Sequence, residues 1–90
     1  MLRVHTERVL LLMKEEIKKI IAKQLRIDAS KISDSSNLLD DLGVDSLEMI
    51  EVVMAIEERF GLSVPDEDLV KLKTVDDAVA YIKSKKPDAV

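Results

Sequence analysis

The sequence contains no cysteine and no tryptophan, and it has only one phenylalanine, one tyrosine, two glycines and two prolines. Without cysteine, disulfides, thiolate metal sites and a cysteine nucleophile are excluded, and nothing indicates an oxidising compartment, so we expect a cytoplasmic protein. The scarcity of glycine, proline and aromatic residues disfavours a β-sandwich or a barrel. The sequence therefore indicates a helical protein with an aliphatic core.

Long hydrophobic runs are also missing. No apolar stretch approaches the ~20 residues that a membrane span requires, so we expect no membrane insertion. The longest apolar run near the start, residues 9–13, is shorter than the ~7–15 residues of a signal-peptide core, and no small-residue cleavage site follows it. Ninety residues are enough for one compact domain and too few for two.

Basic residues are nearly absent from the middle of the chain. Residues 34–68 hold eleven acidic side chains against Arg59 alone, whereas the segments on either side carry a net positive charge. Because phosphate binding requires clustered lysine and arginine, this block disfavours nucleic acid and favours a basic protein partner. The alternative interpretation is a solvated helix face.

Apolar residues at three- and four-residue steps predict a first helix over about residues 7–25. The stripe consists of Leu10, Met13, Ile17, Ile20, Ile21 and Leu25. Residues 26–45 lack this period and are rich in Asp, Ser and Asn, which predicts a long ordered loop pinned by its scattered apolar residues.

The next helix is predicted to begin at Asp45. Asp45 and Glu48 have the spacing of a capping box, and Gly61 is a natural stop. The apolar residues between them cover more than one narrow stripe, so one subset can face the core while another remains for a partner.

Two further helices are predicted. A short one follows Pro65 with Asp66 as its cap, and a longer one is capped by Thr74 and Asp77 and ends at Pro87. We therefore predict an all-α four-helix bundle, with three longer helices, one short helix and a long loop between the first two.

The segment Asp-Leu-Gly-Val-Asp-Ser-Leu at residues 41–47 closely resembles the phosphopantetheine attachment motif of acyl carrier proteins, and the similarity extends over about residues 15–85. This resemblance implies that Ser46 carries a 4'-phosphopantetheine arm donated by coenzyme A, with Asp45 and Gly43 beside it. It further implies a carrier of acyl thioesters for fatty acid biosynthesis. A discrete carrier for polyketides or specialised lipids, and an unmodified helical interaction module, are the alternatives.

The residues around Ser46 suit a serine that carries a covalently attached group. Gly43 permits a tight approach before the helix, and Ser46 lies in the first helical turn, where free amides stabilise a phosphodiester. The alternative is that Ser46 is simply a helix cap. The only histidine, His5, is distant in sequence, and the motif fails the G-x-S-x-G nucleophile pattern. We therefore expect no enzymatic activity, and the resemblance implies that a phosphopantetheinyl transferase attaches the arm.

The resemblance also implies which residues meet partners and cargo. Basic patches on the transferase and on fatty acid synthesis enzymes are expected to dock on the second helix, at Leu47, Glu48, Ile50, Glu51, Met54 and Glu57. The acyl chain is expected to enter a pocket formed by Val52, Ile56, Phe60, Val64, Ala78 and Ile82. Spacing alone leaves open whether the apolar members of the docking set, Ile50 above all, belong to the core.

The expected domain boundaries follow from the same resemblance. Residues 13–86 are expected to form the carrier domain, residues 1–12 an N-terminal extension and residues 87–90 a C-terminal tail. The extension has three open explanations, namely a longer first helix, an upstream start codon or a cloning remnant. The acidic residues near Ser46 miss the EF-hand pattern, so no metal site is predicted, and weak, exchangeable binding of divalent ions is the most that they allow. We expect a monomer.

Overall fold

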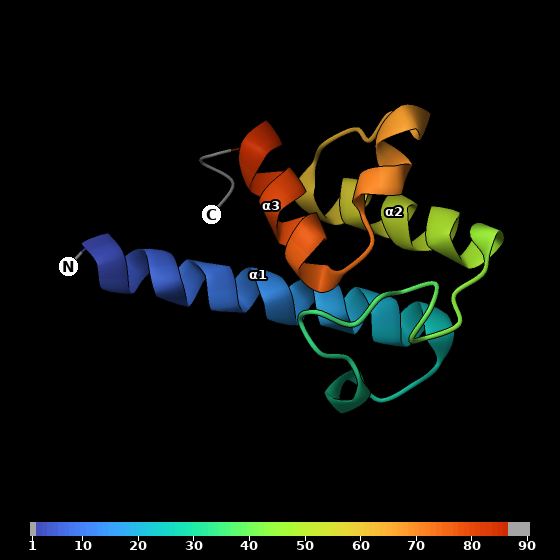
Figure 1. Cartoon of the computed structure of the whole chain (residues 1–90). Coiled ribbons are helices and arrows are strands. Elements are labelled where there is room, and N and C mark those ends of the chain that lie inside the picture. The colour runs from blue at the N-terminus through green and yellow to red at the C-terminus, as the bar shows by residue number, and fades with distance from the viewer. Residues whose placement is uncertain (1, 87–90) are drawn as a thin grey trace.

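The computed structural model describes residues 2–86, and within this range all regular structure is helical. In chain order the elements are α1 (Leu2–Leu25), the 3-10 helix η1 (Ala29–Lys31), α2 (Ser46–Phe60), the 3-10 helix η2 (Asp66–Lys71) and α3 (Val75–Lys85). The prediction of an all-α fold with three longer helices and a short one is confirmed. In Figure 1, α1 runs across the molecule, with α2, η2 and α3 above it and the loop that contains η1 below it.

Helix α1 begins at Leu2, earlier than the predicted start near residue 7. The intervening residues contain neither glycine nor proline, so nothing in them interrupts a helix. The predicted stripe is correct in its centre, because Met13, Ile17 and Ile21 are almost fully buried. Its start projects past α3 (Figure 1). The side chains of Leu11 and Leu12 are exposed.

Arg26 ends α1 in a left-handed conformation. Its φ of 57° is the only positive φ among the described residues other than glycine, and it lets the amide of Ile27 donate to the carbonyl of Ala22 at 3.1 Å. Side chains with a Cβ pay a steric cost in this region that glycine does not.

Replacing Arg26 with glycine is therefore expected to stabilise the fold by about 0.5–1 kcal/mol, measured by urea unfolding. Lys23→Gly is the matched control. Lys23 is equally exposed but lies inside the helix, where glycine should cost about 1 kcal/mol. Destabilisation by both substitutions would contradict the assignment of strain to Arg26.

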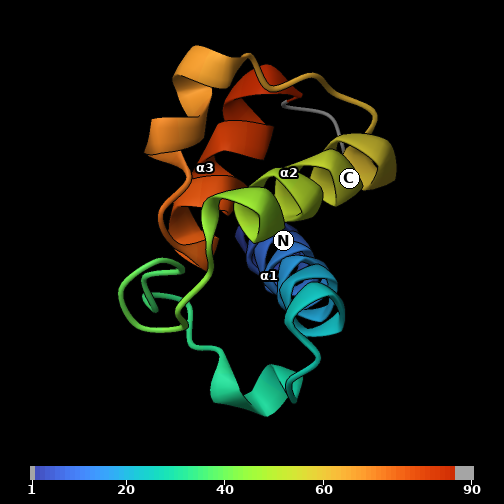
Figure 2. The ribbon, with the colours of Figure 1, turned by 90° about the vertical axis from the view of Figure 1, so that its right-hand side faces the viewer.

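The loop from Arg26 to Asp45 is long and ordered, as predicted. Its buried side chains, Ile32, Leu38 and Val44, anchor it to the core. Main-chain hydrogen bonds add to this, because the amide of Leu38 donates to the carbonyl of Lys73 at 2.9 Å and the amide of Val44 donates to the carbonyl of Leu38 at 2.9 Å. In Figure 2 the loop lies at the lower side of the bundle and leads directly into α2.

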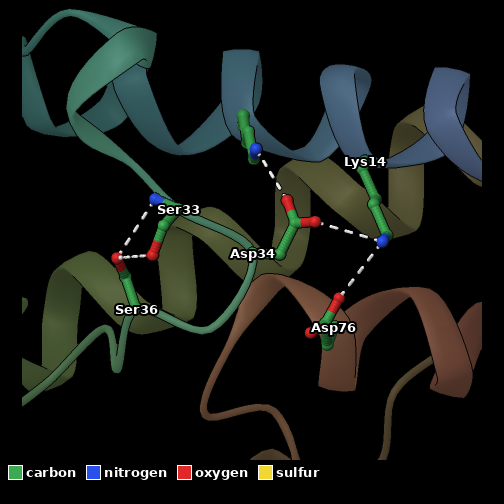
Figure 3. A network of polar contacts seen from close by, with 6 residues as sticks. Lys14, Ser33, Asp34, Ser36 and Asp76 are labelled. Carbon is green, nitrogen blue, oxygen red and sulfur yellow. Dashed lines mark hydrogen bonds and ion pairs between the residues drawn. The ribbon is translucent and has the colours of Figure 1, made fainter.

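A polar network at Asp34 ties this loop to two helices (Figure 3). Its carboxylate forms ion pairs with Lys18 at 2.6 Å and Lys14 at 3.1 Å, both on α1, and Lys14 also reaches Asp76 on α3 at 3.6 Å. The ammonium of Lys18, followed by that of Lys14, holds the pKa of Asp34 below its usual value. The network fixes the loop that precedes Ser46.

The segments after α2 follow the prediction with one correction. Gly61 ends α2 with a left-handed φ of 67°, and Thr74 and Asp77 form the predicted capping box of α3. Asp66 is not a cap, however. Pro65 occupies the boundary of η2 and no side chain caps this 3-10 helix, which starts directly from the φ that the proline ring fixes.

The predicted tail, residues 87–90, and the predicted stop at Pro87 lie outside the described residues. Among residues 2–86, no helix has both the length and the apolar character needed to cross a membrane.

Candidate functional site

Ser46 is the first residue of α2, and the residue before it provides the cap. The carboxylate of Asp45 accepts from the amide of Glu48 at 2.7 Å, and the carboxylate of Glu48 accepts from the amide of Asp45 at 3.1 Å. The predicted capping box is confirmed, and the alternative in which Ser46 is merely the cap is wrong. Ser46 is exposed, and within the described residues its hydroxyl forms no hydrogen bond.

The start of α2 also offers unused donors. The main-chain amides of Ser46 and Leu47 have no acceptor among the described residues, because the two capping carboxylates serve other amides. Free amides and the positive end of the helix dipole favour an anion at this place. The surroundings of the Ser46 oxygen therefore fit a phosphodiester.

Gly43 shapes the turn that leads into α2. Its φ is 68°, a conformation that glycine adopts without strain. A Cβ built at this position would meet nothing within 4 Å, so no group approaches it closely. Within this chain, the role of Gly43 is therefore conformational, and the tight approach that it was expected to permit stays a prediction.

Nothing among the described side chains activates the Ser46 hydroxyl. The start of α1, which carries His5, and the start of α2, which carries Ser46, lie at opposite ends of the molecule (Figure 1). A serine without a neighbouring base is a weak nucleophile at neutral pH. Ser46 therefore presents an exposed hydroxyl without an activating neighbour among the described side chains.

The apolar residues of α2 at i, i+3 and i+7 point to solvent. Leu47 is 65% exposed, Ile50 45% and Met54 59%, so the open question of whether Ile50 belongs to the core is decided in favour of the surface. Together with the exposed Glu51 they form a continuous strip that starts beside Ser46, which we call the α2 strip. Exposed apolar side chains next to acids are typical of a docking surface.

The other two acids predicted for docking have structural partners. Glu48 belongs to the capping box, and Glu57 accepts from the amide of Val64 at 2.7 Å, which braces the loop after α2. Both are half-buried. Of the three predicted acids, Glu51 alone projects without a partner among the described residues.

An apolar cavity of about 350 Å³ opens beside Ser46, between α2 and η2. It is lined by Leu39, Ser46, Met49, Ile50, Leu69, Val70, Leu72 and Lys73. A second cavity of about 200 Å³ shares Ile50 and Leu69 with the first and continues along α2 towards Val64. An apolar chain attached to Ser46 would find an apolar surface directly beside its anchor.

This cavity does not coincide with the predicted acyl pocket. Of the six predicted residues only Val64 lines either cavity, and Val52, Ile56, Ala78 and Ile82 are buried in the core, with Phe60 partly buried against it. The difference arises because the face of α2 that carries Val52 and Ile56 packs into the core, whereas Met49 and Ile50 face η2. Sequence reasoning missed Leu39, Met49 and the apolar side of η2 as lining residues.

A hydrogen bond holds η2, one wall of the cavity, against α3. The hydroxyl of Tyr81 donates to the carboxylate of Asp68 at 2.6 Å, and Lys71 pairs with the same carboxylate at 3.2 Å. The hydrogen bond to Asp68, followed by burial, raises the pKa of Tyr81 to about 12. The hydrogen bond from Tyr81 also lowers the pKa of Asp68.

This bond predicts a pH dependence at the alkaline end. Because the pKa of Tyr81 is higher in the folded state, its stabilisation is complete below about pH 10 and is lost as the pH rises towards 12. Wild type should therefore lose more thermal stability than Tyr81→Phe between these two pH values. Equal losses would contradict the assignment. Tyr81 is the only tyrosine, so phenolate absorbance follows it alone.

Comparisons with known proteins match the part of the chain that contains Ser46 and the cavity beside it. A family model described as the phosphopantetheine attachment site matches residues 15–82. An acyl carrier protein of Helicobacter hepaticus is 44% identical over 72 residues, which cover 80% of this chain and 95% of the relative. Acyl carrier proteins of Bdellovibrio bacteriovorus (49% identical) and Clostridium acetobutylicum (50% identical) each match over 70 residues, covering 78% of this chain and 90% and 91% of the relatives. The matched family segment contains Ser46, both cavities and the α2 strip.

Proposed function

The chain belongs to the acyl carrier protein family, and we propose that its 4'-phosphopantetheine arm is attached to the hydroxyl of Ser46. The observation that carries the proposal is the position of Ser46, exposed in the first turn of α2 with free amides on one side and an apolar cavity on the other. The arm supplies a terminal thiol that binds acyl groups as thioesters.

The chain's own part in the attachment is passive. The Ser46 oxygen accepts the phosphopantetheinyl group of coenzyme A, so that a new oxygen–phosphorus bond forms while the bond to the nucleotide half breaks. The hydroxyl proton passes to a base on the transferase, because no described side chain of this protein is placed to take it. We therefore propose that the protein itself performs no catalysis.

The proposed cargo is an acyl chain of fatty acid biosynthesis. The relatives are named acyl carrier proteins, and the cavity beside Ser46 supplies an aliphatic surface on which each sheltered methylene gains about 0.8 kcal/mol. A discrete carrier for polyketides or specialised lipids would use the same cavity. We assign the shelter to the space between α2 and η2 rather than to the packed core around Val52 and Ile56.

The α2 strip is the proposed docking surface for the transferase and the synthesis enzymes. Its exposed apolar residues begin beside the attachment site, and the acidic block from residue 34 to residue 68 would steer partners that carry basic patches. Fast, electrostatically guided association suits a monomeric carrier that visits several enzymes in turn. The cytoplasm is the proposed setting, in line with the absence of cysteine.

Intact mass tests the attachment. The chain is incubated with coenzyme A and a phosphopantetheinyl transferase of broad specificity, and we expect the mass to rise by one phosphopantetheinyl group. Peptide mapping should then place the added mass on Ser46. A chain that stays unmodified with several transferases would instead support the unmodified interaction module.

A further inference from the structure

The cavity beside Ser46 contains a single charged residue, Lys73, among otherwise uncharged lining residues. Lys73 is exposed, and its ammonium forms no ion pair with any described residue. A lysine at such a place can lay its aliphatic stem along the apolar surface and keep its charge in water. This arrangement explains the position of the aliphatic stem, but the ammonium group still has no ion-pair partner among the described residues.

The main chain of Lys73 is held on both sides. Its carbonyl accepts from the amide of Leu38 at 2.9 Å, in the loop before α2, and its amide donates to the carboxylate of Asp77 at 3.1 Å, at the start of α3. The base of the side chain therefore has a fixed position relative to the cavity, and the conformational freedom lies in the stem alone.

A phosphodiester at Ser46 would add a negative charge where cations are scarce. Arg59 is the only basic residue between residues 34 and 68, and it already pairs with Glu16 on α1 at 3.2 Å. The free amides at the start of α2 supply partial positive charge, but no full charge. Lys73 is the cation that shares a cavity with Ser46.

We propose that Lys73 binds the phosphodiester of the arm at Ser46 and so holds the start of the arm over the mouth of the cavity. The inference rests on the proposed attachment at Ser46 and adds a residue to it. An arm fixed in this way enters the apolar space between α2 and η2 at its first bonds, whereas an arm without this contact leaves the surface freely into solvent.

The test compares the apo and arm-bearing forms of four proteins, namely wild type, Lys73→Met, Lys73→Arg and Lys71→Met. Lys71 is the matched control because it lies on η2, is exposed and pairs with Asp68 instead of lining this cavity. The quantity measured is the difference in Tm between the two forms of each protein. Effects of a substitution on the fold itself cancel in this difference.

We expect Lys73→Met to lower this difference by about 2–4 °C at low salt, the shift that one exposed ion pair produces in a domain of this size. Lys73→Arg and Lys71→Met should leave it unchanged. The effect should largely disappear in about 1 M NaCl, where the screening length falls to about 3 Å. The ³¹P resonance of the arm should move in Lys73→Met and stay in place in Lys71→Met.

The outcomes separate this inference from the function on which it rests. If the wild-type chain gains no arm, the proposed attachment and the role of Lys73 are both overturned. If all four proteins are modified normally and Lys73→Met shows the wild-type difference in Tm, the role of Lys73 alone is overturned. The same holds if Lys73→Arg behaves like Lys73→Met, because the charge would then not be what acts.

Discussion

Replacing Ser46 with alanine is expected to abolish attachment of the phosphopantetheine arm while leaving the fold intact. The substitution removes the oxygen that must form the bond to phosphorus, so the loss is complete. The hydroxyl makes no hydrogen bond within the described residues, and alanine is well tolerated in the first turn of a helix. We therefore expect the free energy of unfolding to change by less than about 0.5 kcal/mol.

Two matched variants complete this experiment. Asp45→Ala removes the cap but keeps the hydroxyl, so it should lose about 1 kcal/mol of stability and still gain the arm. Ser63→Ala removes another exposed hydroxyl and should leave both properties unchanged. Residual mass gain in Ser46→Ala would show that a different residue is the acceptor and would end the assignment. Intact mass and urea unfolding of all three variants provide the readings.

Reversing the charge of Glu51 is expected to slow the attachment of the arm by the transferase. Glu51 lies on the α2 strip, exposed and without a partner among the described residues, so Glu51→Lys changes the field in front of Ser46 without breaking a contact. Partners with basic patches are steered by this field. We expect kcat/KM of the transferase for the carrier to fall about tenfold at low salt.

Glu15→Lys is the control for this variant. It makes the same change in net charge at an exposed residue of α1, away from the α2 strip, and should reduce kcat/KM far less. The loss in Glu51→Lys should also shrink as salt is added, since exposed charges are screened within about 10 Å at 0.1 M. Equal losses in both variants would mean that net charge, and not the α2 strip, governs the encounter.

The capping boxes and the end of α2 were predictable from the sequence because their causes are local. Asp45 with Glu48, and Thr74 with Asp77, satisfy amides within a single helical turn, and Gly61 reverses the chain by its own conformational freedom. Arg26 shows the limit of such reasoning. No local signal marks an arginine as a left-handed residue, and the conformation follows from the way in which α1 must turn into the loop.

The cavity and its wall could not be predicted in this way. Whether Ile50 or Val52 faces the cavity depends on the rotation of α2 about its axis, which is set by packing against α1. From the sequence, Glu57 was likewise predicted to be an acid of the docking surface. Only the tertiary structure shows that its carboxylate accepts a hydrogen bond from the amide of Val64. The hydrogen bond between Tyr81 and Asp68 joins residues thirteen positions apart on two elements, and no sequence pattern predicts it.

The sequence by itself determined that the protein is helical, that Ser46 lies in the first turn of a helix and that an acidic block surrounds it, because these properties depend on composition, spacing and motif. The tertiary structure decided which residues stand beside the Ser46 hydroxyl. It places an apolar cavity between α2 and η2 there, and it places Lys73 at that cavity. These neighbours come from the loop before α2 and from segments more than twenty residues after Ser46, so only the packing of the whole chain brings them together.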